Sequence, residues 1–216
     1  MAWTGRGRSW AAPGFTGAAM DTHGGFSLAE SLVVLALLAL AAAIALPNLS
    51  ETRRKMDLQR LARQVAADAL RARMEALTSC RNVGLVFAEV GGRPYYVMVA
   101  DGNGNGVSRQ EFLRNVDKVL GPRVWLEFLS AGTRLGVPKE WRVPDPSGDG
   151  SLGEEGLRAG RSAIISFSRF GHATPSSVYF NDGRERVLAV RVHGGLGRIR
   201  TLLWQRGWAE WREVRP

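Results

Sequence analysis

The most restrictive feature of this sequence is a long apolar block near its N-terminus. From Phe26 to Leu46 the chain reads FSLAESLVVLALLALAAAIAL, 21 residues whose strongly polar side chains are Ser27, Glu30 and Ser31. As an α-helix this block would extend about 30 Å, which matches the hydrocarbon core of a bilayer. The apolar part of a secretory signal peptide is shorter, about 7–15 residues. We therefore predict that residues 26–46 form a single transmembrane helix.

Glu30 distinguishes this block from a simple membrane anchor. A carboxylate in the bilayer interior costs about 2.5 kcal/mol or more, so intramembrane acids usually have a cationic partner and a function. No Lys or Arg lies between Phe26 and Leu46. The partner of Glu30 would therefore be a lipid-level group, another chain, or a new amino terminus made by cleavage nearby.

The residues around Glu30 closely resemble the N-terminal signature of type IV pilins and type II secretion pseudopilins. Gly24-Gly25-Phe26 precedes the apolar block, Glu30 is the fifth residue counted from Phe26, and Pro47 directly follows the block. In this family a prepilin peptidase cuts after the glycine and methylates the new amino terminus. The resemblance implies cleavage between Gly25 and Phe26 and N-methylation of Phe26. It also implies assembly roles for Pro47 and for Glu30, which would pair with the Phe26 amine of a neighbouring subunit.

Residues 1–25 would then be a leader peptide that prepilin peptidase removes. This leader is longer than many in the family and carries Arg6, Arg8 and Asp21. A start at Met20 would instead leave the six-residue leader MDTHGG. Both starts remain open from the sequence.

The charges beside the apolar block and the family resemblance favour opposite orientations. Arg53, Arg54 and Lys55 lie shortly after the block, and the positive-inside rule would place the C-terminal part of the chain in the cytoplasm. The resemblance places that part in the periplasm, because the peptidase must meet Gly25 on the cytoplasmic side. We adopt the orientation that the resemblance implies and expect a single-pass inner-membrane protein with a cytoplasmic N-terminus and a periplasmic C-terminal head.

Residues 47–80 are predicted to form the amphipathic, periplasmic half of the same helix. The segment contains no Pro or Gly after Pro47, which is expected to bend or locally open the helix. Apolar residues recur at helical spacing, namely Leu58, Leu61, Val65, Ala69, Ala72 and Ala76. The charged residues of this segment are interpreted as a solvated face, with contact to lipid headgroups by residues 53–55 as the alternative.

Residues 82–216 are predicted to form a β-rich globular head. The predicted strands are Asn82 to Val90, Pro94 to Ala100, Val124 to Leu129, Ala163 to Phe167, Val178 to Phe180, Arg186 to Val192 and Arg198 to Trp204. Gly91-Gly92, Asn181-Asp182-Gly183 and Gly194-Gly195 provide turns between them. A helix followed by about seven strands indicates an α+β fold, with the helix packed on antiparallel strands.

The layout of the head resembles the GspH/FimT group of minor pseudopilins. The sequence DGNGNG, residues 101–106, comes after the first predicted hairpin, and Gly197-Arg198-Ile199-Arg200 stands near the C-terminus. The resemblance implies a minor pseudopilin, a structural subunit of a type II secretion pseudopilus. Its expected partners are prepilin peptidase, other major and minor pseudopilins and the inner membrane. The alternative is a FimT-like type IV minor pilin that primes pili or binds DNA for uptake.

The C-terminal segment carries the residues that favour the DNA-binding alternative. Residues 184–216 contain eight Arg and three Glu, interleaved with Trp204, Trp208 and Trp211. Arginines bind phosphate as bidentate donors, and aromatic faces stack on exposed bases. Arg198 and Arg200 are expected on one face of a strand, in a motif like the Gly-Arg-x-Arg element with which FimT-like pilins bind DNA. In the structural alternative these arginines face solvent and the tryptophans cap a core.

Composition and motifs argue against catalysis and against a metal centre. The chain carries a net charge of +9, one cysteine and three histidines, which is little material for a disulfide framework or a zinc site. Residues 101–106 and 145–150 imitate the first half of an EF-hand loop, but Phe112 and Gly156 stand where a bidentate glutamate is needed. We interpret both loops as turns. No nucleophile elbow or phosphate-binding loop is present, so we predict neither an enzyme nor a cofactor, and Cys80 is expected to be a small buried apolar side chain.

Overall fold

The computed structural model describes residues 27–130, 132–148, 150–160 and 162–214, and at residues 45–48 it describes the backbone alone. The predicted leader and the bond between Gly25 and Phe26 lie outside the described residues. The chain divides into two compact units, Met1–Ala45 and Leu46–Pro216.

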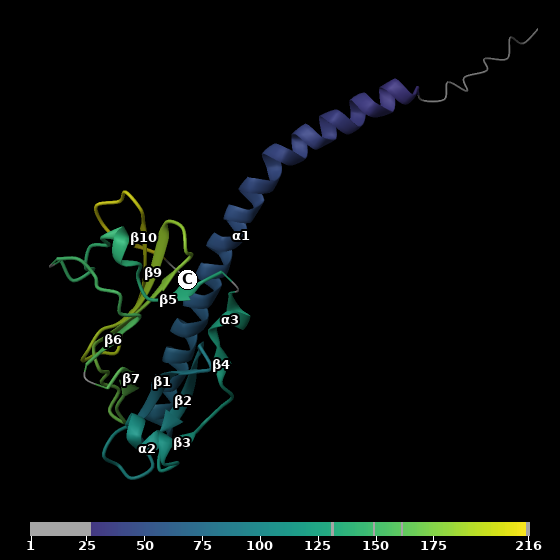
Figure 1. Ribbon diagram of the computed structural model, residues 1–216. Helices are drawn as coiled ribbons and strands as arrows, with labels where there is room; N and C mark the ends of the chain where they lie inside the picture. The colour runs from purple at the N-terminus through teal and green to yellow at the C-terminus, as the bar shows by residue number, and fades with distance from the viewer. Residues whose placement is uncertain (1–26, 131, 149, 161, 215–216) are drawn as a thin grey trace, which may run out of the picture. The chain divides into compact units, whose positions relative to one another are not determined.

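A single helix, α1 (Leu28–Ser79), forms the described part of the first unit and enters the second (Figure 1). Its sequence is rich in Ala, Leu and Arg, which are good helix formers. The helix continues through Pro47, so this proline does not interrupt the secondary structure. At its C-terminal end the hydroxyl of Ser79 donates to the carbonyl of Glu75, and Cys80 leaves the helix with a φ of 54°.

The head contains two antiparallel sheets. The first has the order β3-β2-β1-β7, with β4 also pairing with β2. Its strands are β1 (Val83–Val90), β2 (Arg93–Ala100), β3 (Lys118–Val119), β4 (Val124–Trp125) and β7 (Ile164–Phe167). The second has the order β11-β10-β9-β8-β5, with β6 also pairing with β8. Its strands are β5 (Arg134–Leu135), β6 (Leu157–Ala159), β8 (Ser176–Asn181), β9 (Arg186–Val192), β10 (Ile199–Gln205) and β11 (Arg212–Glu213).

Three short helical segments connect the strands. They are α2 (Arg109–Leu113), α3 (Leu126–Leu129) and a 3-10 turn, η1 (Lys139–Trp141). The strand predicted over residues 124–129 is wrong in its second half, because pairing with β2 ends at Trp125. The chain then turns into α3, where the amide of Ser130 donates to the carbonyl of Leu126, which is buried. Leu126 is thus buried as part of a helical turn, and not as part of the strand that the apolar run 124–129 suggested.

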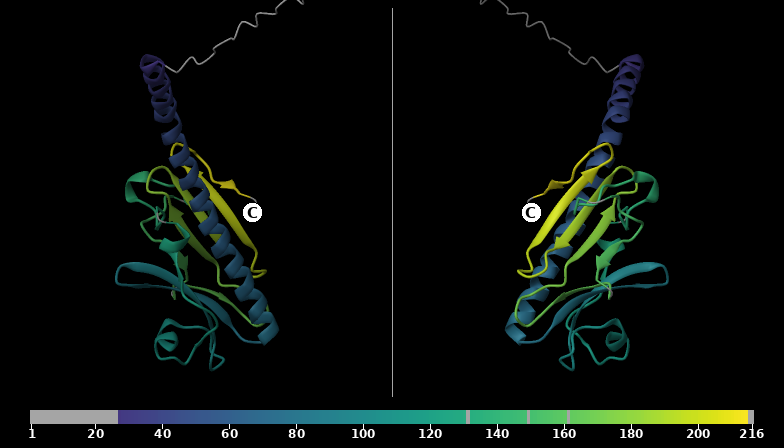
Figure 2. Two further views of the ribbon diagram at one scale, coloured as in Figure 1. Left: turned by 90° about the vertical axis from the view of Figure 1, so that its right-hand side faces the viewer. Right: turned by 90° about the vertical axis from the view of Figure 1, so that its left-hand side faces the viewer.

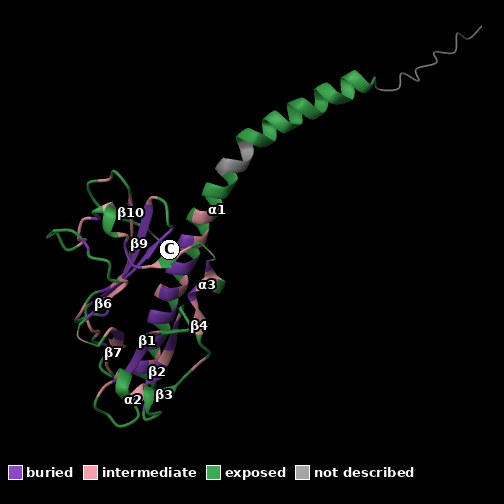
Figure 3. Cartoon of the chain, viewed as in Figure 1, coloured by how far each residue is buried: buried purple, intermediate pink, exposed green. Residues whose placement is uncertain are grey.

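The main core lies between the second part of α1 and one face of each sheet. All six predicted stripe residues, namely Leu58, Leu61, Val65, Ala69, Ala72 and Ala76, are at most 1% exposed (Figure 3). They pack with Leu85 and Ile165 of the first sheet and with Phe180 and Val190 of the second. Figure 2 shows β9 and β10 running beside this part of the helix. The small alanines let the helix approach both sheets closely, which explains their place in the stripe.

The outer faces of the two sheets have cores of their own. On the second sheet Tyr179, Val187, Ala189 and Trp204 pack with Val137, Val143 and Leu152. On the first sheet Val97 and Val99 pack with Val107 and Ile164. A helix that is apolar in its N-terminal part and packs its C-terminal part on antiparallel sheets is a pilin-like architecture. The α+β prediction is therefore confirmed.

Candidate functional site

The N-terminal part of α1 is the first candidate site, because its apolar side chains have no partner within the described chain. Every residue from Leu28 to Ile44 is exposed, and Glu30 is the one ionisable residue among them (Figure 3). The helix is long and apolar enough to cross a membrane, and none of its most apolar window is buried. The exposed surface is therefore available to a lipid phase or to other apolar helices.

Glu30 lies in the first turn of α1. A carboxylate there is stabilised by the positive end of the helix dipole. The side chain of Glu30 has no hydrogen bond or ion pair with any residue that the structure describes. The residues predicted to be processed, Gly25 and Phe26, lie outside the described part, so the pairing of Glu30 with a Phe26 amine remains a prediction.

A cluster of basic side chains on the outer face of the second sheet is the second candidate site. Arg191 of β9 lies directly opposite Arg200 of β10 on one side and Ser177 of β8 on the other. Ser177 in turn lies opposite Arg158 of β6. Cross-strand partners project from the same face at short distance. Three arginines from three strands, Arg158, Arg191 and Arg200, therefore lie in one row. The sequence did not reveal this row, because it depends on strand β6 and on which strands pair with β9.

The positive charges near this cluster affect the pKa of His193. Partial burial lowers the pKa of His193, and the charges of Arg191, Arg200 and Arg198 lower it further, against an opposing contribution from Glu213. Arg200 forms one ion pair, 3.8 Å from its Nε to Oε1 of Glu213. Arg198 is exposed and forms no ion pair with the described residues. Strand β10 begins at Ile199, one residue after the predicted start, so Arg198 directly precedes the strand.

The three C-terminal tryptophans lie in or against the core on the outer face of the second sheet. Trp204 is buried, and its Nε1 donates to the carbonyl of Trp208 at 2.9 Å. Trp211 donates from its Nε1 to the carbonyl of Pro144 at 2.7 Å, and its ring lies 6.3 Å from that of Tyr179. Trp208 is half-buried and packs against the same cluster. This packing is what the structural alternative expected of the tryptophans.

The loop at residues 101–106 is organised by hydrogen bonds to its own carboxylates. Asp101 accepts from the amides of Asn103, Gly104 and Gly106 and from the side chain of Asn82. Burial alone would raise the pKa of Asp101, but these hydrogen bonds outweigh it and lower the pKa. The side chains of Asn103 and Asn105 both donate to Glu111 of α2. The loop's carboxylates are thus occupied by N–H donors.

Gly102 stands where the backbone of the loop passes close to the chain at Val116. Asp117 accepts from the amides of Gly102 and Ser108 and closes the loop. A Cβ atom at Gly102 would lie 2.0 Å from the carbonyl oxygen of Val116, which no side chain can tolerate. Asp117 and Glu111 lie beyond the motif that suggested calcium, and sequence reasoning missed them.

In the second acidic loop, which begins at Asp145, the carboxylate of Asp145 has a backbone amide and an arginine as partners. Asp145 accepts from the amide of Ser147 and forms an ion pair with Arg158 at 2.5 Å. Burial works to raise the pKa of Asp145, and its hydrogen bonds to Ser147 and Arg158 lower it overall. Asp149 lies outside the described residues. In the described ranges no group of three or more His, Cys, Asp or Glu side chains is placed to hold a metal ion.

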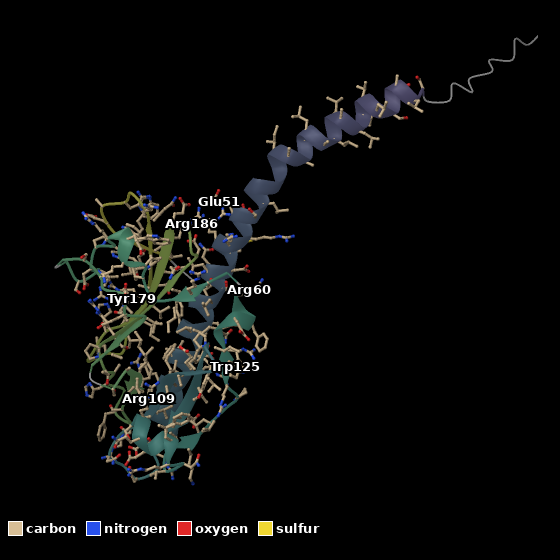
Figure 4. The ribbon with its side chains drawn as sticks, in the orientation of Figure 1. Glu51, Arg60, Arg109, Trp125, Tyr179 and Arg186 are labelled. Atoms are coloured by element: carbon tan, nitrogen blue, oxygen red, sulfur yellow. The ribbon has the colours of Figure 1, made fainter. Side chains whose placement is uncertain are left out.

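Arg186 connects the beginning of β9 to α1. This arginine is buried and lies 2.6 Å from Glu51 of α1, 2.8 Å from Glu185 and 3.7 Å from Asp182 (Figure 4). A buried guanidinium needs such partners, since an unpaired buried charge is costly. No local pattern indicated this cluster, because Glu51 and Arg186 are 135 positions apart.

Cys80 and the two described histidines complete the set of candidate residues. Cys80 is exposed, so the prediction of a buried side chain is wrong; the residue has a left-handed backbone where the chain leaves the helix. His172 is an exposed loop residue whose Nδ1 lies 3.1 Å from the carbonyl oxygen of Gly195. Comparison with known proteins adds nothing to these geometric findings, since no protein-family model, no curated protein and no solved structure matches the chain.

Proposed function

We propose that this chain is a minor pseudopilin, an inner-membrane-anchored structural subunit of a type II secretion pseudopilus. The supporting observation is the division of α1, whose residues 28–44 are all exposed while residues 58–76 bury an apolar stripe against two sheets. An exposed apolar helix attached to a folded head is suited to storage in a membrane and to packing with other helices in a filament. The protein acts by assembly, and its partners are prepilin peptidase and other major and minor pseudopilins.

The first test concerns processing of the N-terminus. The full chain is produced in bacterial membranes with and without prepilin peptidase, and the N-terminus is determined by mass spectrometry. The proposal expects cleavage between Gly25 and Phe26 and a methyl group on the Phe26 amine. Gly25→Val should block both changes, whereas Gly24→Val, one residue away, should leave a processed fraction. An unprocessed wild-type chain in the presence of active peptidase would contradict the proposal.

The second test concerns the role of Glu30 in assembly. Glu30→Gln keeps the size of the side chain and removes its charge, so it should abolish incorporation into sheared filaments while leaving processing and head folding intact. Ser31→Ala is the matched neighbouring change and should assemble normally. Equal incorporation of both variants would show that the Glu30 carboxylate has no part in filament register.

A type IV minor pilin that binds DNA is the second candidate function, and the row of arginines on the second sheet favours it. Arg191 and Arg200 are cross-strand neighbours, and Arg198 is exposed beside them without an ion pair in the described chain. A deletion strain separates the two functions, since loss of a secretion subunit leaves exported proteins in the periplasm and loss of an uptake subunit reduces transformation by DNA.

Direct binding provides the sharper measurement. The full chain in nanodiscs of zwitterionic lipid is titrated with labelled DNA at several salt concentrations, beside Arg198→Ala/Arg200→Ala. A basic protein binds DNA weakly and with strong salt dependence in any case, so the matched control is Arg60→Ala/Arg71→Ala, which removes two exposed arginines of α1. DNA uptake is supported if only the first pair lowers the affinity by about tenfold or more. Equal, small losses in both pairs would exclude this second function.

A further inference from the structure

A groove runs along the head between α1 and the loop and strands at the C-terminal edge of the second sheet. It encloses about 650 Å³, within the range of ligand-binding clefts. Residues 63–73 of α1 form one wall, and residues 196–201 with Glu213 and Val214 form the other. The groove shares only Arg200 with the row of arginines on the outer face, so its helix side is a separate surface.

The floor of the groove is apolar and open. Ala66, Ala67 and Leu70 of α1 face Ile199 and Val214 across it. Leu70 is 50% exposed, and Leu196 at the mouth of the groove is 81% exposed. Neither leucine belongs to the main core, which the buried stripe of α1 forms with the two sheets. Within the described chain nothing covers these two side chains, so their apolar surface is accessible to a ligand.

The rim of the groove is strongly basic. Arg63, Arg73, Arg198 and Arg200 line it, and Glu213 is the acidic residue among the described lining residues. Arg63, Arg73 and Arg198 form no ion pair with described residues. The Nε atom of Arg73 is buried without a hydrogen-bond partner among the described residues. A buried donor left unpaired carries a free-energy cost, so the positive charge of this guanidinium has no counterpart within the described chain.

Gly197 holds Arg73 in this position. The backbone at Gly197 has a φ of 60°, and a Cβ atom there would lie 3.2 Å from Nε of Arg73. The close approach of loop and helix keeps the guanidinium at the groove wall. The positive charge is therefore held in place before binding, which lowers the entropic cost of pairing it with an anionic group.

We propose that this groove binds an acidic segment of another polypeptide, with carboxylates on the arginine rim and apolar side chains on the Leu70 floor. Charge complementarity selects an acidic ligand, and the apolar floor favours a peptide over a nucleic acid, whose phosphates would leave the floor unoccupied. Guanidinium groups bind carboxylates through paired N–H donors. The proposal does not depend on membership of a secretion filament, since it concerns the head alone.

The test measures binding of a labelled peptide of about eight residues that alternates aspartate and leucine. The full chain in zwitterionic nanodiscs is titrated by fluorescence anisotropy at two salt concentrations. Two peptides serve as ligand controls, one with asparagine for aspartate and one with serine for leucine. The proposal expects both control peptides to bind about tenfold more weakly, or weaker still, than the acidic, apolar peptide.

Two pairs of protein variants locate the binding site. Arg63→Glu should weaken peptide binding about tenfold or more. Arg60, labelled in Figure 4, lies on the same helix and does not line the groove, so Arg60→Glu should change binding by about twofold or less. Leu70→Ser should weaken binding, whereas Met74→Ser, also exposed but outside the groove, should not. All four residues are exposed, so the fold is expected to survive each change.

Several results would overturn the proposal. If a labelled oligonucleotide binds more tightly than the peptide and Leu70→Ser affects neither, the groove is a phosphate-binding surface. A second copy of the chain fills the groove if three results coincide: the chain self-associates, Arg63→Glu abolishes the self-association, and the peptide does not compete with it. If Arg60→Glu and Arg63→Glu weaken the peptide equally, binding reflects bulk charge alone. A failed filament test with intact groove binding would disprove the proposed function and leave this inference in place.

Discussion

The two parts of α1 are both rich in apolar residues but use them differently. Residues 28–44 expose every side chain, whereas Leu58, Leu61, Val65 and their neighbours at helical spacing are buried against both sheets. In the second part, charged residues share the remaining sides with a few exposed apolar residues such as Leu70, and one narrow stripe forms the core. In the first part the apolar residues surround the helix. A helix that is apolar all round requires an apolar medium, and the head does not supply it.

The largest expected effect is on the stability of the head. Leu61→Ala removes a side chain that is 1% exposed in the main core, and should lower the free energy of unfolding of the head by about 2–5 kcal/mol. Leu35→Ala makes the same chemical change in the exposed part of α1 and should have no measurable effect on the head. Chemical denaturation of the full chain, monitored by tryptophan fluorescence, compares the two. Equal effects would contradict the contrast between the two parts.

The second prediction concerns membrane insertion instead of folding. Leu37→Arg places a charge in the middle of the exposed apolar part of α1, and should disfavour insertion by about 2.5–3.5 kcal/mol. Met74→Arg, on an exposed position of the second part, should leave insertion unchanged. The measurement is the fraction of protein that stays with membranes after alkaline carbonate extraction. Full retention of Leu37→Arg would argue against residues 28–44 as the membrane span.

A polar contact inside the second part of α1 sharpens the comparison further. The hydroxyl of Tyr96 donates to Oδ2 of the buried Asp68 at 2.6 Å, and Gln64 donates to the same oxygen at 3.0 Å. Tyr96→Phe removes one donor and should cost about 1–3 kcal/mol of stability. Tyr95→Phe is the matched control, because the Tyr95 hydroxyl has no hydrogen-bond partner among the described residues. Its effect should stay within about 0.5 kcal/mol.

The smallest expected effect is a pH dependence from the same contact. Burial, and to a lesser extent the hydrogen bond to Asp68, raises the pKa of Tyr96 far above its usual range. The folded state therefore keeps the phenolic proton where the unfolded chain loses it, near pH ~10. Stability should be full below that pH and should fall above it by at most about 1.4 kcal/mol per pH unit. Tyr96→Phe should flatten this part of the stability profile, and an unchanged slope would contradict the assignment.

Local pattern was sufficient for the elements whose residues carry their own periodicity. The six stripe residues of α1 and the hairpin β1–β2 were predicted from spacing and from Gly91-Gly92, and the structure has both. The register of this hairpin pairs Val90 with Arg93 around the two glycines. Spacing failed at residues 126–129, where an apolar run was consistent with strand or helix and burial of Leu126 decided for a helix.

The candidate sites divide in the same way. Glu30 was identified from one carboxylate in an apolar block, a signal that needs no tertiary information. The partners of Asp101 beyond its own loop, the ion pairs of Arg186 and the row that joins Arg158 to Arg200 come from residues far apart in sequence. The same holds for the groove, whose two walls come from α1 and from the C-terminal end of the second sheet.

The sequence by itself determined that the chain has an apolar helix with one carboxylate, an amphipathic continuation and a β-rich head. These properties depend on the order of residues along a helix or strand, and hydrophobic spacing encodes them directly. Only the tertiary structure decided that Trp204 is core, that Cys80 is exposed, and that Arg63 and Arg73 face Leu196 and Gly197 across a groove. The reason is that burial and charge pairing depend on which distant segments meet, and local periodicity does not specify those contacts.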